Sequence, residues 1–324
     1  MRRDRAVVVA EADWSGPWCR EQSPDIVPEN EMRSAFPLLL LLLLAIPSAA
    51  QSDARGELLR RINAERQRAG STPLRLSLEL TRAAQAHAAE VAARGSLKLR
   101  AGSTEEMRER LKRAGYQAHA WTESLAATSG GLESVLRDFR QGDPEIWRKL
   151  LDPEYRDLGI GLDRVGRTPL YTFLFAVPQA DYFARRTAGL HDLARARAEM
   201  LARVNAERKK AGARPLSPNS RLDRAAQRHA EDMLARSYFA HRSPEGKSVR
   251  ERSREAGYEW RMIGENIAEG QFTVAEVMDT WMHSPGHRRN ILDPGFRELG
   301  AGLALGKNSD GWQVEWVQAF GTRR

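Results

Sequence analysis

The sequence is almost without cysteine, since its 324 residues include only Cys19. One thiol cannot form an internal disulfide, so any folded domain must be held together by its hydrophobic core. The length is comfortable for two such cores. A hydrophobic fraction of 41% with 29% charged residues is typical of folded domains and excludes a wholly disordered chain.

Clusters of one charge are also missing. The net charge is +8, but the arginines lie among glutamates in stretches such as "LRRINAERQRAG" and "LARVNAERKKAG", a pattern typical of a solvated helix face. A nucleic-acid groove requires clustered basic residues with interleaved aromatic ones. We therefore predict no nucleic-acid partner.

Familiar catalytic motifs are absent as well. The sequence contains no G-x-S-x-G elbow, no H-E-x-x-H helix, no Walker loop and no dinucleotide fingerprint. The glycines of "LGAGLALG" have the spacing of strand and turn glycines and not of a phosphate-binding loop. These absences argue against the common serine hydrolases, zincins and nucleotide-binding enzymes.

The longest apolar run is short. It covers residues 38–46, whereas a helix that spans a bilayer needs about 20 apolar residues. Arg33 precedes the run, and the small residues Ser48 and Ala50 follow it, which is the pattern of a signal peptide over residues 32–50 with cleavage after Ala50. We predict export to the periplasm or the medium, with no transmembrane segment in the mature chain.

Residues 1–31 are polar and charged, unlike an export signal. We hypothesise that translation begins at Met32 and that residues 1–31 are a misassigned N-terminal extension. Because Cys19 lies in this extension, the mature chain is expected to be free of cysteine.

The chain contains an internal repeat. Four blocks recur in the same order at an offset of 142 residues, which becomes 141 near the end. The pairs are "RINAERQRAGSTPL" with "RVNAERKKAGARPL", "TRAAQAHAAE" with "DRAAQRHAED", "RAGY" with "EAGY", and "LLDPEYRDLGIGL" with "ILDPGFRELGAGL". The repeat predicts two copies of one domain, over residues 52–180 and 192–324, joined by a linker over residues 181–191.

The second copy begins with helical periodicity and ends with strand periodicity. Apolar residues at 3.6-residue spacing predict helices near 193–204 and 222–233. A capping-box pattern at 273–276 and a Ser-Pro pair at 284–285 predict two further helix starts. Alternation over 299–316 predicts a hairpin with one buried face. Helices first and strands last favour an α+β fold, with helices packed on an antiparallel sheet.

An ordered set of motifs runs through the second copy: "NAER", "AAQRHAEDM", "YFAHRSPEG", "AGY", "GENIA", "WMHSPGHRRNIL", and "ELGAGLA" followed by "WVQAFG". In this order they resemble the CAP superfamily of cysteine-rich secretory, antigen 5 and pathogenesis-related proteins, and above all its cysteine-free bacterial SCP-like extracellular domains. The resemblance implies tandem α-β-α sandwich domains and secretion. It also implies a cleft lined by two histidines and acidic residues, which in some relatives holds a divalent metal.

Carried over to this sequence, the resemblance implies that His241 of "YFAH", Glu265 of "GENIA" and His287 of "PGH" line the cleft. We predict that the three bind a divalent metal, zinc or calcium, and that they are the catalytic residues if the protein is an enzyme. The second acidic residue of the family follows the tryptophan of the penultimate helix. It has no counterpart here, because only four residues separate Trp281 from Gly286.

The residue types alone are consistent with such a site. His287 is expected at about the third residue of a helix, where the helix dipole disfavours protonation of the imidazole. Glu265 lies between apolar residues, so its carboxylate should be partly buried and need a partner. The spacings of 24 and 22 residues from His241 to Glu265 and on to His287 match no local zinc motif.

The first copy lacks both histidines. Leu99 and Ile146 stand in the places of His241 and His287, while Glu123 matches Glu265. We predict that the first copy is a degenerate domain without this site, with a structural or partner-presenting role.

Three other residues near the site receive different predictions. His229 is matched by His87 and lies on an apolar helix stripe, so it is expected to be a hydrogen-bonded core histidine. His283 is expected to face solvent at the rim. Asn266 is expected to hold backbone near Glu265.

Three functions stay open at this point. The first is a binding module whose second domain binds an envelope lipid, peptide or cell-wall polymer, with or without a metal. The second is a metal-dependent hydrolase of a peptide or an envelope polymer, in which Glu265 is the base or a third ligand. The third is a purely structural envelope protein.

Overall fold

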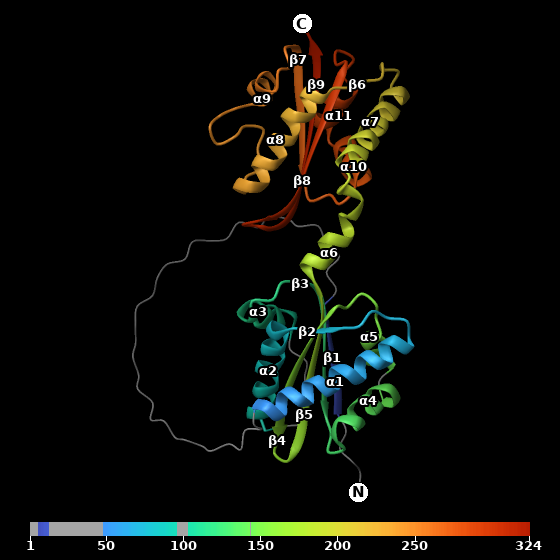
Figure 1. Cartoon of the computed structure of the whole chain (residues 1–324), viewed down its shortest axis with the longest axis vertical. Helices are drawn as coiled ribbons and strands as arrows, with labels where there is room; N and C mark the ends of the chain where they lie inside the picture. Colours follow the sequence, from blue (N-terminus) through green and yellow to red (C-terminus); the bar gives the residue numbers. More distant parts are fainter. Residues whose placement is uncertain (1–5, 13–47, 96–102, 143) are drawn as a thin grey trace, which may run out of the picture. The chain divides into compact units, whose positions relative to one another are not determined.

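The computed structural model describes residues 6–12, 48–95, 103–142 and 144–324. The chain divides into two compact units, residues 1–179 and 180–324. Each unit has its own sheet and its own buried cores (Figure 1).

The second unit has helices before strands, as predicted. Its helices are α7 (Leu193–Lys210), α8 (Ser220–Arg236), α9 (Val249–Glu255), α10 (Val274–His283) and α11 (Pro285–Leu292), with η1 (Ala188–Leu190) before them. Its strands are β6 (Ser217–Pro218), β7 (Trp260–Glu269), β8 (Glu298–Asn308) and β9 (Gly311–Arg323), in the order β6-β8-β9-β7. The hairpin of β8 and β9 pairs antiparallel, and β7 pairs antiparallel with β9.

Helices cover both faces of this sheet, which makes an α-β-α sandwich (Figure 1). The helix α8 packs on one face, and α7, α10 and α11 pack on the other. The prediction of a hairpin with one buried face was therefore wrong. α8 lies directly on β8 because Gly300 and Gly302 have no side chain at the contact. A Cβ on these two residues would come within 2.2 and 2.3 Å of the α8 backbone, respectively.

The first unit repeats this layout. Its helices are α1 (Ser48–Arg68), α2 (Leu78–Ala93), α3 (Thr104–Ala114), α4 (Gly131–Gly142) and α5 (Pro144–Leu150). Its strands are β1 (Ala6–Ala12), β2 (Arg75–Leu76), β3 (Ala118–Ala127), β4 (Asp157–Val165) and β5 (Thr168–Pro178), in the order β1-β3-β5-β4-β2. Apart from β1, the order and direction of the strands match those of the second unit, in agreement with the repeat.

The ends of the predicted domains differ in detail from the two units. Residues 181–191, the predicted linker, lie within α6 (Gln179–Arg186) and η1 and just beyond them. Phe183 and Leu190 are buried in the main core of the second unit, so this segment packs with that unit.

Some predictions concern residues outside the described ranges. Cys19, Leu99 and the apolar run at 38–46 are among them. Residues 6–12, within the segment interpreted as a misassigned extension, form β1 along β3. The start site and the signal peptide therefore stay predictions. Within the described ranges, every helix is too short or too polar to cross a membrane.

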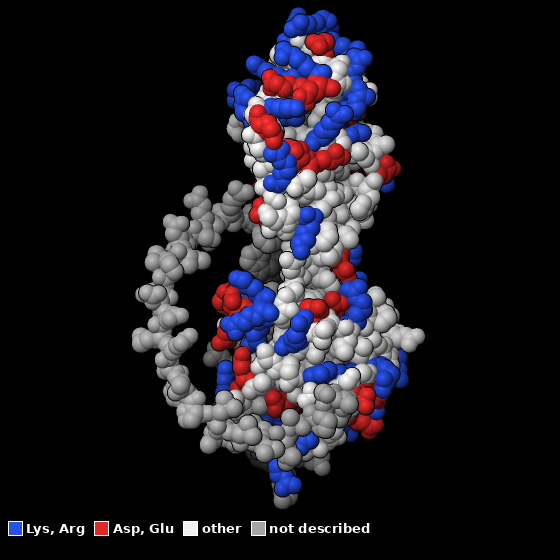
Figure 2. All heavy atoms as spheres, turned by 60° about the vertical axis from the view of Figure 1, so that its left-hand side comes forward, with Lys and Arg blue, Asp and Glu red and all other residues white. Residues whose placement is uncertain are grey.

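Acidic and basic side chains are interspersed on the face of the protein shown in Figure 2, but two arginines of the repeated "NAER" motif are not on the surface. Arg66 and Arg208 are fully buried. The Arg208 guanidinium donates to the carbonyls of Arg214 (2.6 Å) and Ile291 (2.7 Å), among others. The interpretation of these stretches as solvated helix faces was wrong at these two positions, where the arginine ties the first helix to the chain entering the sheet.

We expect Arg208→Met to lower the free energy of unfolding of the second unit by about 2 kcal/mol or more, because it leaves buried carbonyl groups without donors. Urea denaturation followed by amide exchange of β9 peptides would measure this change in the second unit alone. Arg203→Met, at an exposed pair with Glu199, is the control and should cost less than about 1 kcal/mol. Equal effects of the two substitutions would contradict the role given to Arg208.

Candidate functional site

The centre of the site is Glu265 on the edge strand β7. Its side chain is only 4% exposed, and both carboxylate oxygens have partners. Oε1 lies 2.9 Å from Nδ1 of His241, and Oε2 accepts from the Arg252 guanidinium at 2.5 Å. The partial burial and the need for a partner predicted from the sequence are therefore both present.

The bond to Glu265 determines which nitrogen of His241 is available. A carboxylate can only accept, so Nδ1 of His241 carries the proton. In the neutral ring, Nε2 then keeps its lone pair. The His241 side chain is 56% exposed, so this nitrogen belongs to a ring that a ligand can approach.

Arg252 holds the loop that carries His241 as well as Glu265. Its guanidinium donates to the carbonyls of His241 (3.2 Å) and Lys247 (2.7 Å). One buried side chain thus connects α9, the loop after α8 and β7. The sequence analysis missed Arg252, although it recurs as Arg110 at the repeat offset, in "RER" of both copies.

His287 is the third residue of α11, as predicted. Ser284 is at the N-cap position, but its side chain makes no capping hydrogen bond. The pKa of His287 is lowered by burial first and by the nearby His241 second. The direction agrees with the prediction, but its main cause is burial. Its Nδ1 is buried and has no hydrogen-bond partner among the described residues.

An amide network fixes α11 against β7. Asn290 donates to the Glu265 carbonyl (3.1 Å) and to Oδ1 of Asn266 (2.8 Å). Asn266 in turn donates to the His287 carbonyl (3.1 Å). The prediction that Asn266 holds backbone near Glu265 is therefore confirmed: the backbone group that it holds is the carbonyl of His287. Asn290 was missed by the sequence analysis.

The donor set does not form a three-residue metal site. Within the described ranges, no three His, Cys, Asp or Glu side chains are grouped as metal ligands. Both oxygens of Glu265 are already hydrogen-bonded, whereas among the described residues Nδ1 of His287 has no partner. A metal here would be held by the imidazoles, with Glu265 orienting His241 from outside and not as a third ligand.

The first unit keeps the glutamate and the arginine but uses them differently. His87 Nδ1 lies 2.8 Å from Glu123 Oε1, and both side chains are 1% exposed. Arg110 lies 3.6 Å from the other oxygen. Ile146, in the place of His287, is fully buried in a core. The Glu123 carboxylate is therefore buried within this unit and out of reach of solvent.

Two other histidines of the second unit have the roles predicted for them. His229 is buried and bonds the Ala240 carbonyl at 3.0 Å, as expected of a core histidine. His283 is exposed, as expected, and its ring bonds the Asp279 carbonyl.

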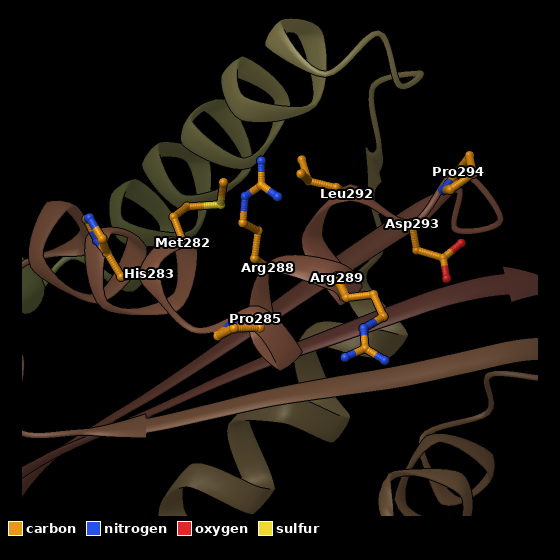
Figure 3. Close-up of a pocket in the computed structure, with 8 residues that line it drawn as sticks. All are labelled: Met282, His283, Pro285, Arg288, Arg289, Leu292, Asp293 and Pro294. Atoms are coloured by element: carbon orange, nitrogen blue, oxygen red, sulfur yellow. The ribbon is translucent and has the colours of Figure 1, made fainter.

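A hollow of about 570 Å³ lies beside His283, on α10, α11 and the turn after them (Figure 3). Its lining includes Met282, Arg288, Arg289 and Leu292, but none of the three predicted site residues.

Comparison with known proteins assigns the fold and the motifs to a family. The profile of the Cysteine-rich secretory protein family (CAP) matches residues 59–175 and 201–320, most of the chain. The chain belongs to the CAP family. The two matched segments are the two copies of the repeat, so the first unit is a CAP domain in spite of its missing histidines.

Two known proteins are similar to parts of this chain. Uncharacterized protein YkwD of Bacillus subtilis is 43% identical over 99 residues, 31% of this chain and 38% of that protein. Uncharacterized membrane protein YlbC of the same organism is 33% identical over 75 residues, 23% of this chain and 22% of that protein. The matches thus span well under half of these relatives.

Solved structures are more distant. An extracellular protein containing a SCP domain from Bacillus anthracis is 16% identical, with a TM-score of 0.36, over 63% of this chain and 82% of that one. An outer surface protein from Borrelia burgdorferi is 20% identical, with a TM-score of 0.36, over 39% of this chain and 92% of that one.

Proposed function

We propose that this CAP protein is exported and that its second unit is a binding module, whose cleft at His241, Glu265 and His287 binds a divalent metal and, with it, an envelope lipid, peptide or polymer. The observation that carries the proposal is the pair of imidazoles beside a buried, fully engaged carboxylate. One ring is exposed and oriented by Glu265, and the other has a buried nitrogen without a partner among the described residues.

The residues that would hold the metal are His241, through Nε2, and His287. The Glu265 bond settles which nitrogen of His241 faces a ligand, and burial lowers the pKa of His287, which favours the neutral form that a metal requires. Two imidazole donors suit zinc and not calcium, which takes oxygen ligands. A bound zinc ion would supply an electrophilic centre for the oxygen atoms of a ligand. Glu265 would act through His241 and not as a ligand.

The hydrolase is the second candidate, and the same contacts make it the weaker one. A general base needs a carboxylate oxygen within reach of water. Both oxygens of Glu265 accept hydrogen bonds, one of them from a buried guanidinium, and the side chain is almost inaccessible. A binding function is therefore compatible with the side chains as they lie. Hydrolysis with Glu265 as the base would require its carboxylate to break the hydrogen bond with Arg252.

Calorimetric titration of the full chain with Zn²⁺ and with Ca²⁺ tests the proposal. We expect one site, and we expect His287→Ala to weaken it by more than the roughly 10- to 100-fold that loss of an outer-shell partner costs. His283→Ala, at the exposed neighbour, should leave the affinity unchanged.

Two results would contradict the binding proposal. No uptake of either ion by the wild-type protein would remove the metal site and favour a structural role. Metal-dependent cleavage of a peptide or envelope polymer, lost in His287→Ala, would establish the hydrolase in place of the binding module.

A further inference from the structure

One core histidine is connected to the exposed site residue through the backbone. His229 lies on the inner face of α8 and is 1% exposed. Its Nε2 lies 3.0 Å from the carbonyl oxygen of Ala240, the residue directly before His241. A carbonyl can only accept, so Nε2 of His229 carries the proton and donates.

The loop that carries His241 is tied to α8 by side-chain contacts, in which the Tyr238 hydroxyl donates to Asp232 and Arg236 pairs with Glu245 at 2.6 Å. It begins at Ser237, which caps α8 in the left-handed conformation. Arg252 holds the carbonyls of His241 and Lys247 from the α9 side. From the α8 side, the His229 bond is the contact nearest to His241. Together the His229 and Arg252 bonds hold consecutive carbonyls, those of Ala240 and His241.

The first unit has a histidine at the position of His229 but lacks the site histidines. There His87, the counterpart of His229, turns its Nδ1 to Glu123 and closes that carboxylate within the core. In the second unit His229 instead bonds the loop, and Glu265 takes His241 as its partner. The histidine at this helix position thus bonds the buried glutamate in the first unit and the loop carbonyl in the second. In the second unit the glutamate is left to His241, whose imidazole is exposed.

We infer that His229 is a positioning residue for the cleft: its bond to the Ala240 carbonyl holds the loop so that His241 meets Glu265 with Nε2 facing outward. This inference rests on the proposed function for its purpose, but the geometry it describes can be tested without any metal. Burial lowers the pKa of His229 to about 4, in keeping with a neutral donor. The neutral ring leaves Nδ1 as a buried acceptor without a partner among the described residues.

Two substitutions separate the hydrogen bond from the packing of the ring. In His229→Leu the donor is lost and an apolar side chain is kept. In His229→Gln the amide nitrogen takes about the place of Nε2 and can still donate. In the metal-free full chain we expect His229→Leu to raise amide exchange at Ser243, whose N–H donates to the Lys247 carbonyl at 2.9 Å, by about fivefold or more. We expect His229→Gln to restore most of the wild-type protection.

The Zn²⁺ affinity should follow the same order, with a loss of roughly tenfold for His229→Leu and recovery in His229→Gln. His87→Leu in the first unit is the matched control and should change neither quantity. Unchanged loop exchange in His229→Leu, or equal loosening in both His229 variants, would overturn the inference. A wild-type protein without Zn²⁺ affinity would refute the proposed function, and the exchange result alone would then decide the role of His229.

Discussion

Replacing Gly302 with alanine is expected to destabilise the second unit by about 3 kcal/mol or more, at the upper end of what overpacking costs. The added Cβ would lie 2.3 Å from the Ala226 carbonyl carbon in the backbone of α8. Backbone cannot rotate away as a side chain can, so α8 would have to lift from the sheet. Since α8 carries His229 and leads into the His241 loop, the site should be lost with the packing.

Gly306 on the same strand is the matched control. A Cβ there would meet the end of the Leu234 side chain at 3.1 Å, and this side chain can move. Gly306→Ala should therefore cost less than about 1 kcal/mol. Urea denaturation with amide exchange of β9 peptides would measure both variants, and similar losses of stability in the two would contradict the close packing of α8 on β8.

The second large effect is expected at Glu315, which lies on β9 opposite Glu269 of β7. It is 1% exposed, one of its oxygens has no partner among the described residues, and burial with the nearby Glu269 raises its pKa to about 8. The folded state therefore binds a proton that the unfolded chain, with a glutamate pKa near 4.5, releases. The contribution of Glu315 to the free energy of unfolding should fall as pH rises from about 4.5 to 8.

Glu315→Gln keeps the shape of the protonated acid and removes the titration. It should raise the stability of the second unit by roughly 2 to 3 kcal/mol at pH 7 and change it little at pH 4. Denaturation of both proteins across this pH range would measure the difference. Glu259→Gln, at an exposed position, is the control. A Glu315→Gln curve parallel to that of the wild type would contradict a buried neutral Glu315.

The architecture could be predicted from the sequence because it depends on local patterns. The stripe of α7, the start of α11 and the hairpin after 298 all follow from spacing along a short stretch. The coverage of both sheet faces by helices could not be predicted in this way. The alternation in β8 and β9 indicates one apolar face, and on the other face glycines stand where apolar side chains would have signalled burial. Gly300 and Gly302 are the signal that was available, since two glycines on one face of a strand allow a helix backbone to approach.

The site was predictable in its members but not in its contacts. His241, Glu265 and His287 were found through the family resemblance, and their spacing matches no local motif. Which oxygen of Glu265 faces which partner depends on how the loop after α8 and α9 fold back on β7, and no sequence period encodes that. The burial of Arg252 and Arg208 was not recognised from the sequence, because the chain has many other arginines that lie on the surface. Their recurrence in both copies of the repeat was the one available sign that they are buried.

The central claim is that the binding site lies in the second unit at His241 and His287, and ring signals of the seven histidines test it directly. A ¹H–¹³C NMR spectrum of the full chain, assigned by single substitutions, would be recorded during titration with Zn²⁺. Our account predicts that the signals of His241 and His287 shift together and saturate at one equivalent, while those of His87 and His283 stay in place. Shifts at His87 or His283 in their stead, or no shift at His287, would contradict it.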